Sequence, residues 1–482
     1  MSIYLQPEPG KEEMVDALTQ VVARVVDHVA RLGEMPSCGP AWGPQTAAAV
    51  DAIRGEPLPQ EPAELGAVLD RFFGDWVNRS FTAAGPGYLA FVPGGGILPA
   101  AIADLISNMT NRFTGIRDAA PCLVELEGTA LRWLAHIVGM PVSTRGIFTT
   151  GGSMAAFAAV VCAREKLLGP DLAGGTVYAS SQVHHSVTKA ARLAGIPADR
   201  VVRLPVDAAY RMNPDALARA IVQDRAAGRR PFLVVSTAGT TNTGAVDPIE
   251  EVQAVCRRND VWHHVDGAYG AFFYLCPELQ QRLVGMGDAD SLTLDPHKGL
   301  FLPYGTGALL VRDGADLRRA FGSRAEYLPE ADAEAYDPHQ YGPDLSKGFP
   351  GLRVWLTLKL LGVRKIREML EEKRRLAVWA AQEVQRTEGL RMAASPDLSL
   401  FAFHADLPGR GLAMENDVTT ALLNGVRERG RVMLSGCRVD GRYLARICVL
   451  NFRTHEAHMR ACIDDLRASL SGTLARVERG GP

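Results

Sequence analysis

The sequence predicts an α/β protein organised around a doubly wound, mainly parallel sheet. Three observations support this fold class. Strand-like and helix-like segments alternate from Gly146 to Val311, as they do in strand–helix–strand units. Two strand-like segments end in small and polar residues, which is typical of the sheet edge where ligands bind. The end of the chain changes to a compact mixture of strands and helices, which predicts a small α+β C-terminal domain.

Length and composition indicate a globular protein with more than one core. The chain has 482 residues, too many for a single hydrophobic core, so two or three packed domains are expected. It is 47% hydrophobic and 22% charged, which is ordinary for such proteins. The net charge of −2, without a large basic or acidic block, argues against nucleic acid or an anionic membrane as the main partner.

Three features favour a cytoplasmic protein. The eight cysteines form no Cys-x-x-Cys pair and most lie in apolar runs, so we interpret them as buried free thiols in a reducing compartment, and we expect no metal site. The N-terminus is acidic and polar, unlike a signal peptide. The apolar run from Tyr88 to Ile106 is broken by Pro93, Pro99 and Asp104, so it does not predict a membrane span.

The first part of the chain is expected to be mostly helical. Glu12 to Leu32 has apolar residues, many of them valines, on one broad helical face. Met35 to Gln60 is rich in Pro and Gly and is interpreted as an irregular connection. Further helices are expected at Pro62–Asn78 and Pro121–Pro141.

The central part of the chain carries the expected seven-stranded sheet. Its strand candidates are short apolar or alternating runs, and helix candidates fill most of the gaps between them. The expected strands are Gly146–Thr149, Thr176–Ala179, Val201–Leu204, Phe232–Ser236, Trp262–Val265, Ser291–Leu294 and Gly307–Val311.

The chain then leads into the small domain. Arg324 to Pro343 has few apolar residues and is interpreted as a mobile loop, and Lys347 to Leu361 as a connecting helix. We expect an N-terminal helical segment at residues 1–86, a large domain at 87–360 and a small domain at 361–482. In the small domain, strands are expected at Ser399–Ala405, Val432–Ser435 and Tyr443–Leu450, and helices at Val418–Arg429 and His455–Val477.

Ser291 to Lys298, which reads Ser-Leu-Thr-Leu-Asp-Pro-His-Lys, is the motif around which the site is predicted. Pro296 cannot continue a strand, so His297 and Lys298 follow its carboxyl end, where open α/β sheets bind ligands. A lysine placed there can form a Schiff base with a carbonyl if its amine loses its proton. A lone lysine is more often a solvated surface charge, so a second motif is needed before a cofactor site can be predicted here.

Trp262 to Tyr269, which reads Trp-His-His-Val-Asp-Gly-Ala-Tyr, supplies the second motif. Asp266 precedes Lys298 by about one strand–helix–strand unit, so neighbouring parallel strands would bring a carboxylate and an amine to one edge. Pyridoxal phosphate requires that pair, because the lysine holds its aldehyde and a carboxylate keeps its ring nitrogen protonated. The alternative for Asp266 alone is a helix N-cap.

Together these motifs resemble those of the group II pyridoxal-phosphate decarboxylases, the family of the aromatic-L-amino-acid decarboxylases. The resemblance runs from about Gly87 to at least Arg453. It implies fold type I, the aspartate-aminotransferase-like fold, with pyridoxal 5'-phosphate bound at the subunit interface of a homodimer. It also implies that the N-terminal segment wraps around the partner subunit.

The resemblance assigns a phosphate site to the segment Phe148–Met154, which reads Phe-Thr-Thr-Gly-Gly-Ser-Met and leads into an alanine-rich helix. Small residues at a helix start expose backbone N–H groups at its positive end. Gly151, Gly152 and Ser153 match the phosphate cup of the family. His297 and Lys298 are placed at the cofactor as well.

Four further residues are assigned around the cofactor by the same resemblance. His184 is expected on one face of the ring, with His185 as the alternative, and Ala268 on the opposite face. Thr240 is expected near the ring oxygen or the substrate. Asp295 stands beside the phosphate where many family members have asparagine, so its negative charge there requires a partner.

The substrate pocket is expected to include Phe91, Val92 and Pro93 from a glycine-rich loop at Gly87–Pro99. Many aromatic decarboxylases have an aromatic residue where Val92 stands. Arg117, with Asp118, lies in a segment that the family contributes across the dimer interface. These two residues form either a solvated pair or a surface facing a polar substrate.

The resemblance implies α-decarboxylation of an L-amino acid, an aromatic one among the candidates, to the amine and CO₂. A tyrosine of Arg324–Pro343 is expected to protonate the α-carbon, with Tyr336 preferred and Tyr341 as the alternative. Lys298 and Asp266 are shared by other pyridoxal-phosphate enzymes, so an oxidative aldehyde synthase or a carbon–carbon lyase stays open. A non-catalytic cofactor-binding protein is the third alternative.

Overall fold

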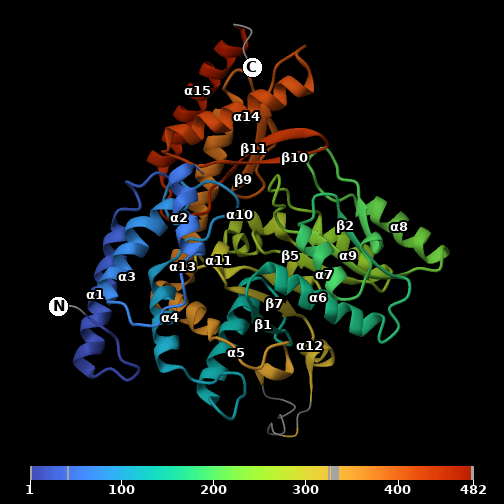
Figure 1. Cartoon of the computed structure of the whole chain (residues 1–482). Coiled ribbons are helices and arrows are strands. Elements are labelled where there is room, and N and C mark those ends of the chain that lie inside the picture. Colours follow the sequence, from blue (N-terminus) through green and yellow to red (C-terminus); the bar gives the residue numbers. More distant parts are fainter. Residues whose placement is uncertain (1–2, 41–42, 324–325, 327–335, 479–482) are drawn as a thin grey trace.

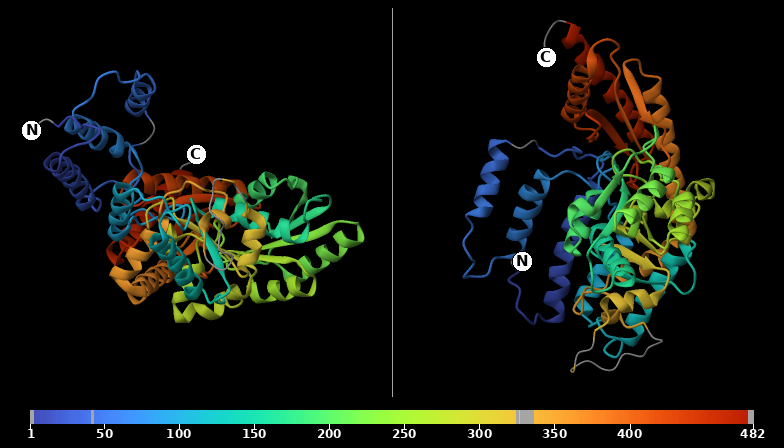
Figure 2. Two further views of the ribbon diagram at one scale, coloured as in Figure 1. Left: turned by 90° about the horizontal axis from the view of Figure 1, so that it is seen from below. Right: turned by 90° about the vertical axis from the view of Figure 1, so that its right-hand side faces the viewer.

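The computed structural model describes residues 3–40, 43–323, 326 and 336–478. A large α/β body carries a smaller domain at one end, and the N-terminal helices stand off from one side of the body (Figures 1 and 2). The described part of the predicted loop Arg324–Pro343 is therefore Glu326 and the residues from Tyr336 onward.

The large domain is built on the predicted seven-stranded sheet. Its strand order is β1-β7-β6-β5-β4-β2-β3, and β7 alone runs antiparallel to its neighbours. Strands β2, β6 and β7 are buried along their whole length, because helices cover both faces of the sheet. The strands are β1 Arg145–Thr149, β2 Gly175–Ser180, β3 Val201–Leu204, β4 Arg230–Thr237, β5 Trp262–Asp266, β6 Ser291–Leu294 and β7 Gly307–Val311.

The helices between the strands complete the doubly wound arrangement. The central helix α6 is rich in buried alanines, which let it lie close to the sheet against β4, β5, β6 and β7. The helices of this domain are α4 Leu98–Thr110, α5 Pro121–Ile137, α6 Gly152–Leu167, α7 His185–Leu193, α8 Pro214–Ala226, α9 Ile249–Arg258, α10 Pro277–Gln280, α11 Pro296–Gly299 and α12 Gly314–Phe321. The predicted fold class, fold type I with a mainly parallel sheet, is confirmed.

Helix α13, Pro350–Gln385, connects the two domains and is broken at Gly362, whose φ of 72° is not helical. Residues of α13 up to Leu370 pack into the core of the large domain, whereas those from Leu376 to Val384 pack into the core of the small domain. The connecting helix predicted at Lys347–Leu361 is thus the first part of a longer one.

The small domain has an antiparallel four-stranded sheet in the order β10-β11-β9-β8. Its elements are β8 Leu390–Ala394, β9 Leu400–Ala405, α14 Gly411–Arg429, β10 Ser435–Val439, β11 Arg442–Cys448 and α15 Glu456–Glu478. A strand was expected at Val432–Ser435, but the observed strand, β10, begins only at Ser435. The reason is that Met433 instead exchanges backbone hydrogen bonds with Gly87 and Leu89, which approach from the start of the large domain.

The N-terminal segment forms three helices, α1 Lys11–Ala30, α2 Pro44–Arg54 and α3 Leu65–Arg71. Helix α2 lies inside the stretch that was expected to be irregular, because Pro44 can open a helix and the alanines after it favour one. Valines on α1 remain exposed, among them Val22, Val25 and Val26. Within the described residues, none of the helices is long and apolar enough to cross a membrane.

Candidate active site

A cavity of about 410 Å³ lies at the carboxyl ends of β4, β5 and β6, where α6 begins. This is the edge at which open α/β sheets bind ligands. Most of the predicted site residues lie in its wall, although they come from distant parts of the chain. The cavity is lined by Phe91, Val92, Thr150, Gly151, Gly152, Ser153, Met154, His184, Ser186, Thr237, Gly239, Thr241, Asp266, Ala268, Tyr269, Asp295, His297 and Lys298.

Lys298 reaches the cavity from the turn that ends β6. The strand stops at Leu294, and Pro296 opens the short helix α11, as a proline does at a first helical position. The Lys298 Nζ atom lies 2.9 Å from Oδ2 of Asp295, and about a fifth (22%) of the lysine side chain is exposed. The amine is therefore held inside the cavity and remains accessible from it.

Asp266 is the last residue of β5, the strand that pairs in parallel with β6. Its Oδ1 accepts a hydrogen bond of 3.2 Å from the backbone N–H of Ala268. Behind it, His264 is fully buried between the hydroxyls of Ser291 and Thr293, at 2.8 and 3.1 Å. The carboxylate thus sits on a rigid polar layer and faces the same cavity as Lys298.

The first turn of α6 forms a cradle on the other side of the cavity. Gly151 has a φ of 147°, which side chains rarely tolerate, and a Cβ atom on Gly152 would lie 3.1 Å from Asp295 Oδ2 and 3.2 Å from the Ala268 side chain. The N–H groups at the start of this 16-residue helix have no partner within the helix. Such a turn can bind an anion such as phosphate.

His184 is the N-cap of α7, and its ring is held by local hydrogen bonds. Its Nδ1 accepts from the backbone N–H of Ser186 at 3.3 Å and lies 2.7 Å from the Ser186 hydroxyl. Burial is the largest effect on its pKa and lowers it, and a neutral ring whose Nδ1 accepts this backbone hydrogen bond carries its proton on Nε2. His185, the alternative, packs against His184 with the ring centroids 4.1 Å apart and the rings tilted by 45°, but it does not line the cavity.

Four predicted site residues lie outside the cavity wall of this chain: Pro93, Arg117, Thr240 and Tyr336. The Thr240 hydroxyl is buried in its own turn, 2.9 Å from that of Thr243, and accepts from the N–H of Ala245. Arg117 is exposed, and its backbone N–H donates to Asp337. Tyr336 is buried with its ring 5.3 Å from that of Tyr341.

Arg446 on β11 is a residue that the sequence analysis did not single out. Its side chain is buried, and its guanidinium donates to backbone carbonyls of Phe91, Thr241 and Asn242 and to the Ser435 hydroxyl. Phe91 itself has a φ of 53°, and its N–H donates to Ser435. The small domain therefore fixes one wall of the cavity. The available signal was an arginine inside an otherwise apolar strand pattern.

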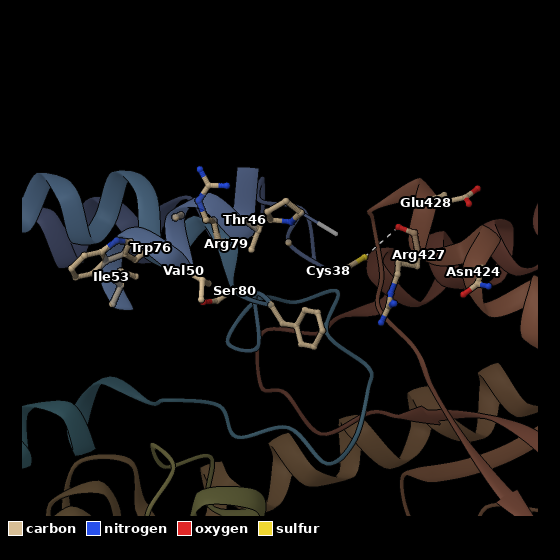
Figure 3. Close-up of a pocket in the computed structure, with 14 residues that line it drawn as sticks. Cys38, Thr46, Val50, Ile53, Trp76, Arg79, Ser80, Asn424, Arg427 and Glu428 are labelled. Atoms are coloured by element: carbon tan, nitrogen blue, oxygen red, sulfur yellow. Dashed lines mark hydrogen bonds between the residues drawn. The ribbon is translucent and has the colours of Figure 1, made fainter. Parts of the chain in front are cut away.

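A larger cavity of about 930 Å³ lies elsewhere, between the N-terminal helices and α14 (Figure 3). Its wall includes Trp76, Arg79, Arg427 and Glu428, and the Cys38 thiol donates there to the Arg427 carbonyl. Among the described residues of its wall there is no lysine, and so no paired amine and carboxylate of the kind found at Lys298. Within the described residues, no cluster of three or more His, Cys, Asp or Glu side chains could hold a metal ion.

Comparison with known proteins identifies the class. The conserved-domain model described as pyridoxal-dependent decarboxylase matches residues 59–406. The chain belongs to this family. It is a pyridoxal-phosphate-dependent carboxy-lyase that acts on an L-amino acid, and the cradle, the carboxylate and the lysine of the cavity fit that cofactor.

Particular relatives resemble the chain over nearly its whole length. It is 31% identical to an aromatic-L-amino-acid decarboxylase of Bacillus atrophaeus, covering 95% of each chain. It is 29% identical to an L-2,4-diaminobutyrate decarboxylase of Rhizobium meliloti, over 91% of this chain and 88% of the relative. Among solved structures, Oryza sativa TDC with PLP and tryptamine superposes with a TM-score of 0.91 at 26% identity, covering 97% of this chain and 99% of that one.

Proposed function

We propose that the protein decarboxylates an L-amino acid with a neutral, apolar side chain, an aromatic one first among them, at the cavity that contains Lys298 and Asp266. The placement of these two side chains on adjacent strand ends in one cavity supports the cofactor chemistry, and the match to the decarboxylase family supports the reaction. When bound, pyridoxal phosphate supplies an electron sink for the electron pair left by the departing carboxylate.

Each residue has a separate task in this proposal. Lys298 would hold the cofactor through its aldehyde, since its amine lines the cavity. Asp266 holds a proton on the ring nitrogen, for which its place at the end of β5 is suited. His184 and Ala268 cover the two faces of the ring. Both line the cavity, and the neutral His184 ring can stack without repelling a protonated ring.

The phosphate is proposed to bind at the start of α6. Gly151, Gly152 and Ser153 provide backbone N–H groups there, and His297 lies in the same wall. His297 is oriented by donation from its Nδ1 to the Thr306 carbonyl at 2.8 Å. Thr240 is proposed to act on the cofactor only if its turn rearranges, because its hydroxyl already pairs with Thr243.

The substrate proposal rests on the remaining wall. Phe91, Val92 and Met154 are apolar, and Lys298 is the only lysine or arginine among the described residues that line the cavity. A wall without a second cation favours a neutral side chain over an acidic one. Arg446 does not line the cavity and donates to backbone carbonyls and to the Ser435 hydroxyl, so it positions the wall at Phe91 rather than adding a cation to it. Pro93 and Arg117 are proposed to contribute from the rim.

We further propose a homodimer, in which the partner subunit completes the cavity and fills the space beside the N-terminal helices. Exposed apolar side chains on α1 and α4 support this, because contiguous patches of this kind mark interfaces. They include Val22, Val25, Val26 and Val29 on α1 and Ile102, Leu105, Ile106 and Met109 on α4. The eight free cysteines are consistent with the proposed cytoplasmic location.

One incubation tests the function. The holoenzyme is given an equimolar mixture of tryptophan, tyrosine, phenylalanine, 2,4-diaminobutyrate and glutamate, all L, and the amines, CO₂, ammonia and peroxide formed are measured. An aromatic amine with equal CO₂ is expected. Consumption of 2,4-diaminobutyrate or glutamate alone would contradict the apolar substrate, whereas aldehyde with peroxide and ammonia would identify an oxidative aldehyde synthase. The Lys298→Ala protein is the control.

A further inference from the structure

The carboxylate of Asp295 occupies an unusual position between the lysine and the cradle at the start of α6. Only 2% of its side chain is exposed, and its Oδ2 lies 2.9 Å from Lys298 Nζ. Its Oδ1 has no hydrogen-bond partner within the described part of the chain. A Cβ atom on Gly152 would lie 3.1 Å from Oδ2, so the carboxylate touches the cradle itself. Lys298 is therefore the close counter-ion of a buried carboxylate.

Cofactor binding removes that counter-ion. Lysine amines are ordinarily protonated at neutral pH, and the amine must lose its proton before its nitrogen can bond to a carbonyl carbon. At the same time a phosphate brings negative charge to the neighbouring cradle. An ionised Asp295 would then be buried beside a like charge, with only the His297 ring left close to it, at 3.7 Å from Oδ2, which is strongly unfavourable.

We propose that Asp295 accepts the proton that Lys298 gives up when the cofactor binds. The Lys298 ammonium transfers one proton to the Asp295 carboxylate. The lysine nitrogen then forms a C=N bond with the aldehyde carbon, its remaining two hydrogens and the aldehyde oxygen leave as water, and Asp295 stays as a neutral carboxylic acid. Charge and atoms balance without an external acid or base. This inference rests on the proposed role of Lys298.

The other titratable groups around Asp295 are poorer acceptors. Burial lowers the pKa of His297, whose Nε2 lies 3.7 Å from Asp295 Oδ2, so its ring takes up a proton less readily. Burial also lowers the pKa of His184, across the cavity. Asp266 faces the same cavity and is assigned to the ring nitrogen. The short distance and the unpartnered Oδ1 single out Asp295.

Proton counting tests the transfer. The apoenzyme is titrated calorimetrically with pyridoxal 5'-phosphate near neutral pH, in buffers that differ in ionisation enthalpy, so that the protons released per site are measured. Asp295→Asn should release about one proton more than the wild type, and its cofactor affinity should rise about tenfold more per unit increase in pH. The control is Asp316→Asn, because Asp316 is also buried and lies 2.7 Å from a lysine, Lys166, away from the cavity. Equal proton counts in the wild type and Asp295→Asn would overturn the proposal.

A second measurement applies even if Asp295→Asn binds no cofactor. In the infrared difference spectrum of wild-type holoenzyme against apoenzyme, the C=O band of a protonated carboxylic acid should appear and should persist in Asp316→Asn; its absence overturns the proposal. The Lys298→Ala protein distinguishes failure of the proposed covalent attachment at Lys298 from failure of the proposed proton acceptance by Asp295. If it still binds the cofactor covalently, the proposed lysine is wrong. If it does not, unchanged proton counts refute the role of Asp295 alone.

Discussion

At the scale of single residues, Lys298 is expected to be the only point of covalent attachment. The purified wild type should be yellow, and Lys298→Ala should lose the absorbance of the lysine-bound cofactor. The reason is that no other lysine lines the cavity among the described residues. Lys166→Ala is a suitable control, since Lys166 pairs with Asp316 outside the cavity. An unchanged spectrum in Lys298→Ala would place the bond on another lysine.

Asp266→Asn should separate binding from turnover. Asparagine has nearly the same shape and can still accept from the Ala268 N–H, so much of the cofactor affinity should be kept. Loss of the charge that stabilises a protonated ring nitrogen should lower kcat by about 10²-fold or more. Cofactor affinity by fluorescence and kcat by amine formation measure the two effects. Near-normal kcat would mean that the electron-sink role of Asp266 is wrong.

The sequence located most of the cavity wall because motif residues that follow strands must meet at one edge of a parallel sheet. Lys298, Asp266, His184 and the residues at the start of α6 are of this kind. Arg446 is different, since it comes from the other domain and supports the cavity wall only through long-range hydrogen bonds, such as the one to the Phe91 carbonyl. The orientation of Thr240 toward Thr243 depends on turn geometry that residue types alone do not define.

At the scale of single elements, β5 should make the protein sensitive to acid. Burial lowers the pKa of His263 to about 3 and that of His264 to about 4, both from 6.5. Because the folded values are depressed, the unfolded chain binds more protons below pH 6.5. The stability that these neutral rings contribute is therefore complete above pH 6.5 and is lost as the pH falls toward 4.

The test follows unfolding by denaturant between pH 7 and 4.5. His264→Asn should lose stability on acidification less steeply than the wild type, by about 1.4 kcal/mol per pH unit, because one fewer buried ring must be protonated. His136→Asn is the matched control, since His136 is exposed. Parallel pH profiles for His264→Asn and the wild type would show that His264 is not held neutral by the fold.

The segment before α13 is expected to supply the acid that protonates the α-carbon. Burial raises the pKa of Tyr336 well above its usual value, so its phenol keeps its proton. Tyr336→Phe should lower amine formation by about 10²-fold and, in air, give aldehyde and peroxide from the unprotonated carbon. Tyr341→Phe and Tyr327→Phe are the comparisons, although Tyr327 lies outside the described residues. If Tyr336→Phe and Tyr341→Phe both form amine at the wild-type rate, neither is the acid.

The limits of prediction from sequence also appear at this scale. All seven strands of the large sheet were expected, because each is a short apolar run between turn residues. The antiparallel direction of β7 was not, since a strand pattern reads the same in both directions. Strand β8, Leu390–Ala394, was missed because it is only half-buried and has no β-branched residues.

At the scale of the whole molecule, the proposed dimer should depend on α4. Ile106→Asp would place a charge in the exposed apolar face of α4, and sedimentation should then show a monomer with little decarboxylase activity. Val222→Asp on α8 is the control, because Val222 is at least as exposed but lies away from α1 and α4. A monomeric wild type, or a dimeric and active Ile106→Asp protein, would contradict the proposed interface.

The antiparallel placement of β7 between β1 and β6 has a consequence for folding during synthesis on the ribosome. In the sheet, β1 pairs only with β7, so the strand that ends at Thr149 has no neighbour until Gly307 has been synthesised. The cavity wall at Phe91 forms later still, because its hydrogen-bond partners Ser435 and Arg446 lie near the end of the chain and are synthesised late. Domains generally fold as units during synthesis, with the N-terminal part first. Because β1 and β7 belong to one domain, that domain cannot complete its sheet before Gly307 has been synthesised, and the nascent chain carries the apolar strand β1 unpaired until then.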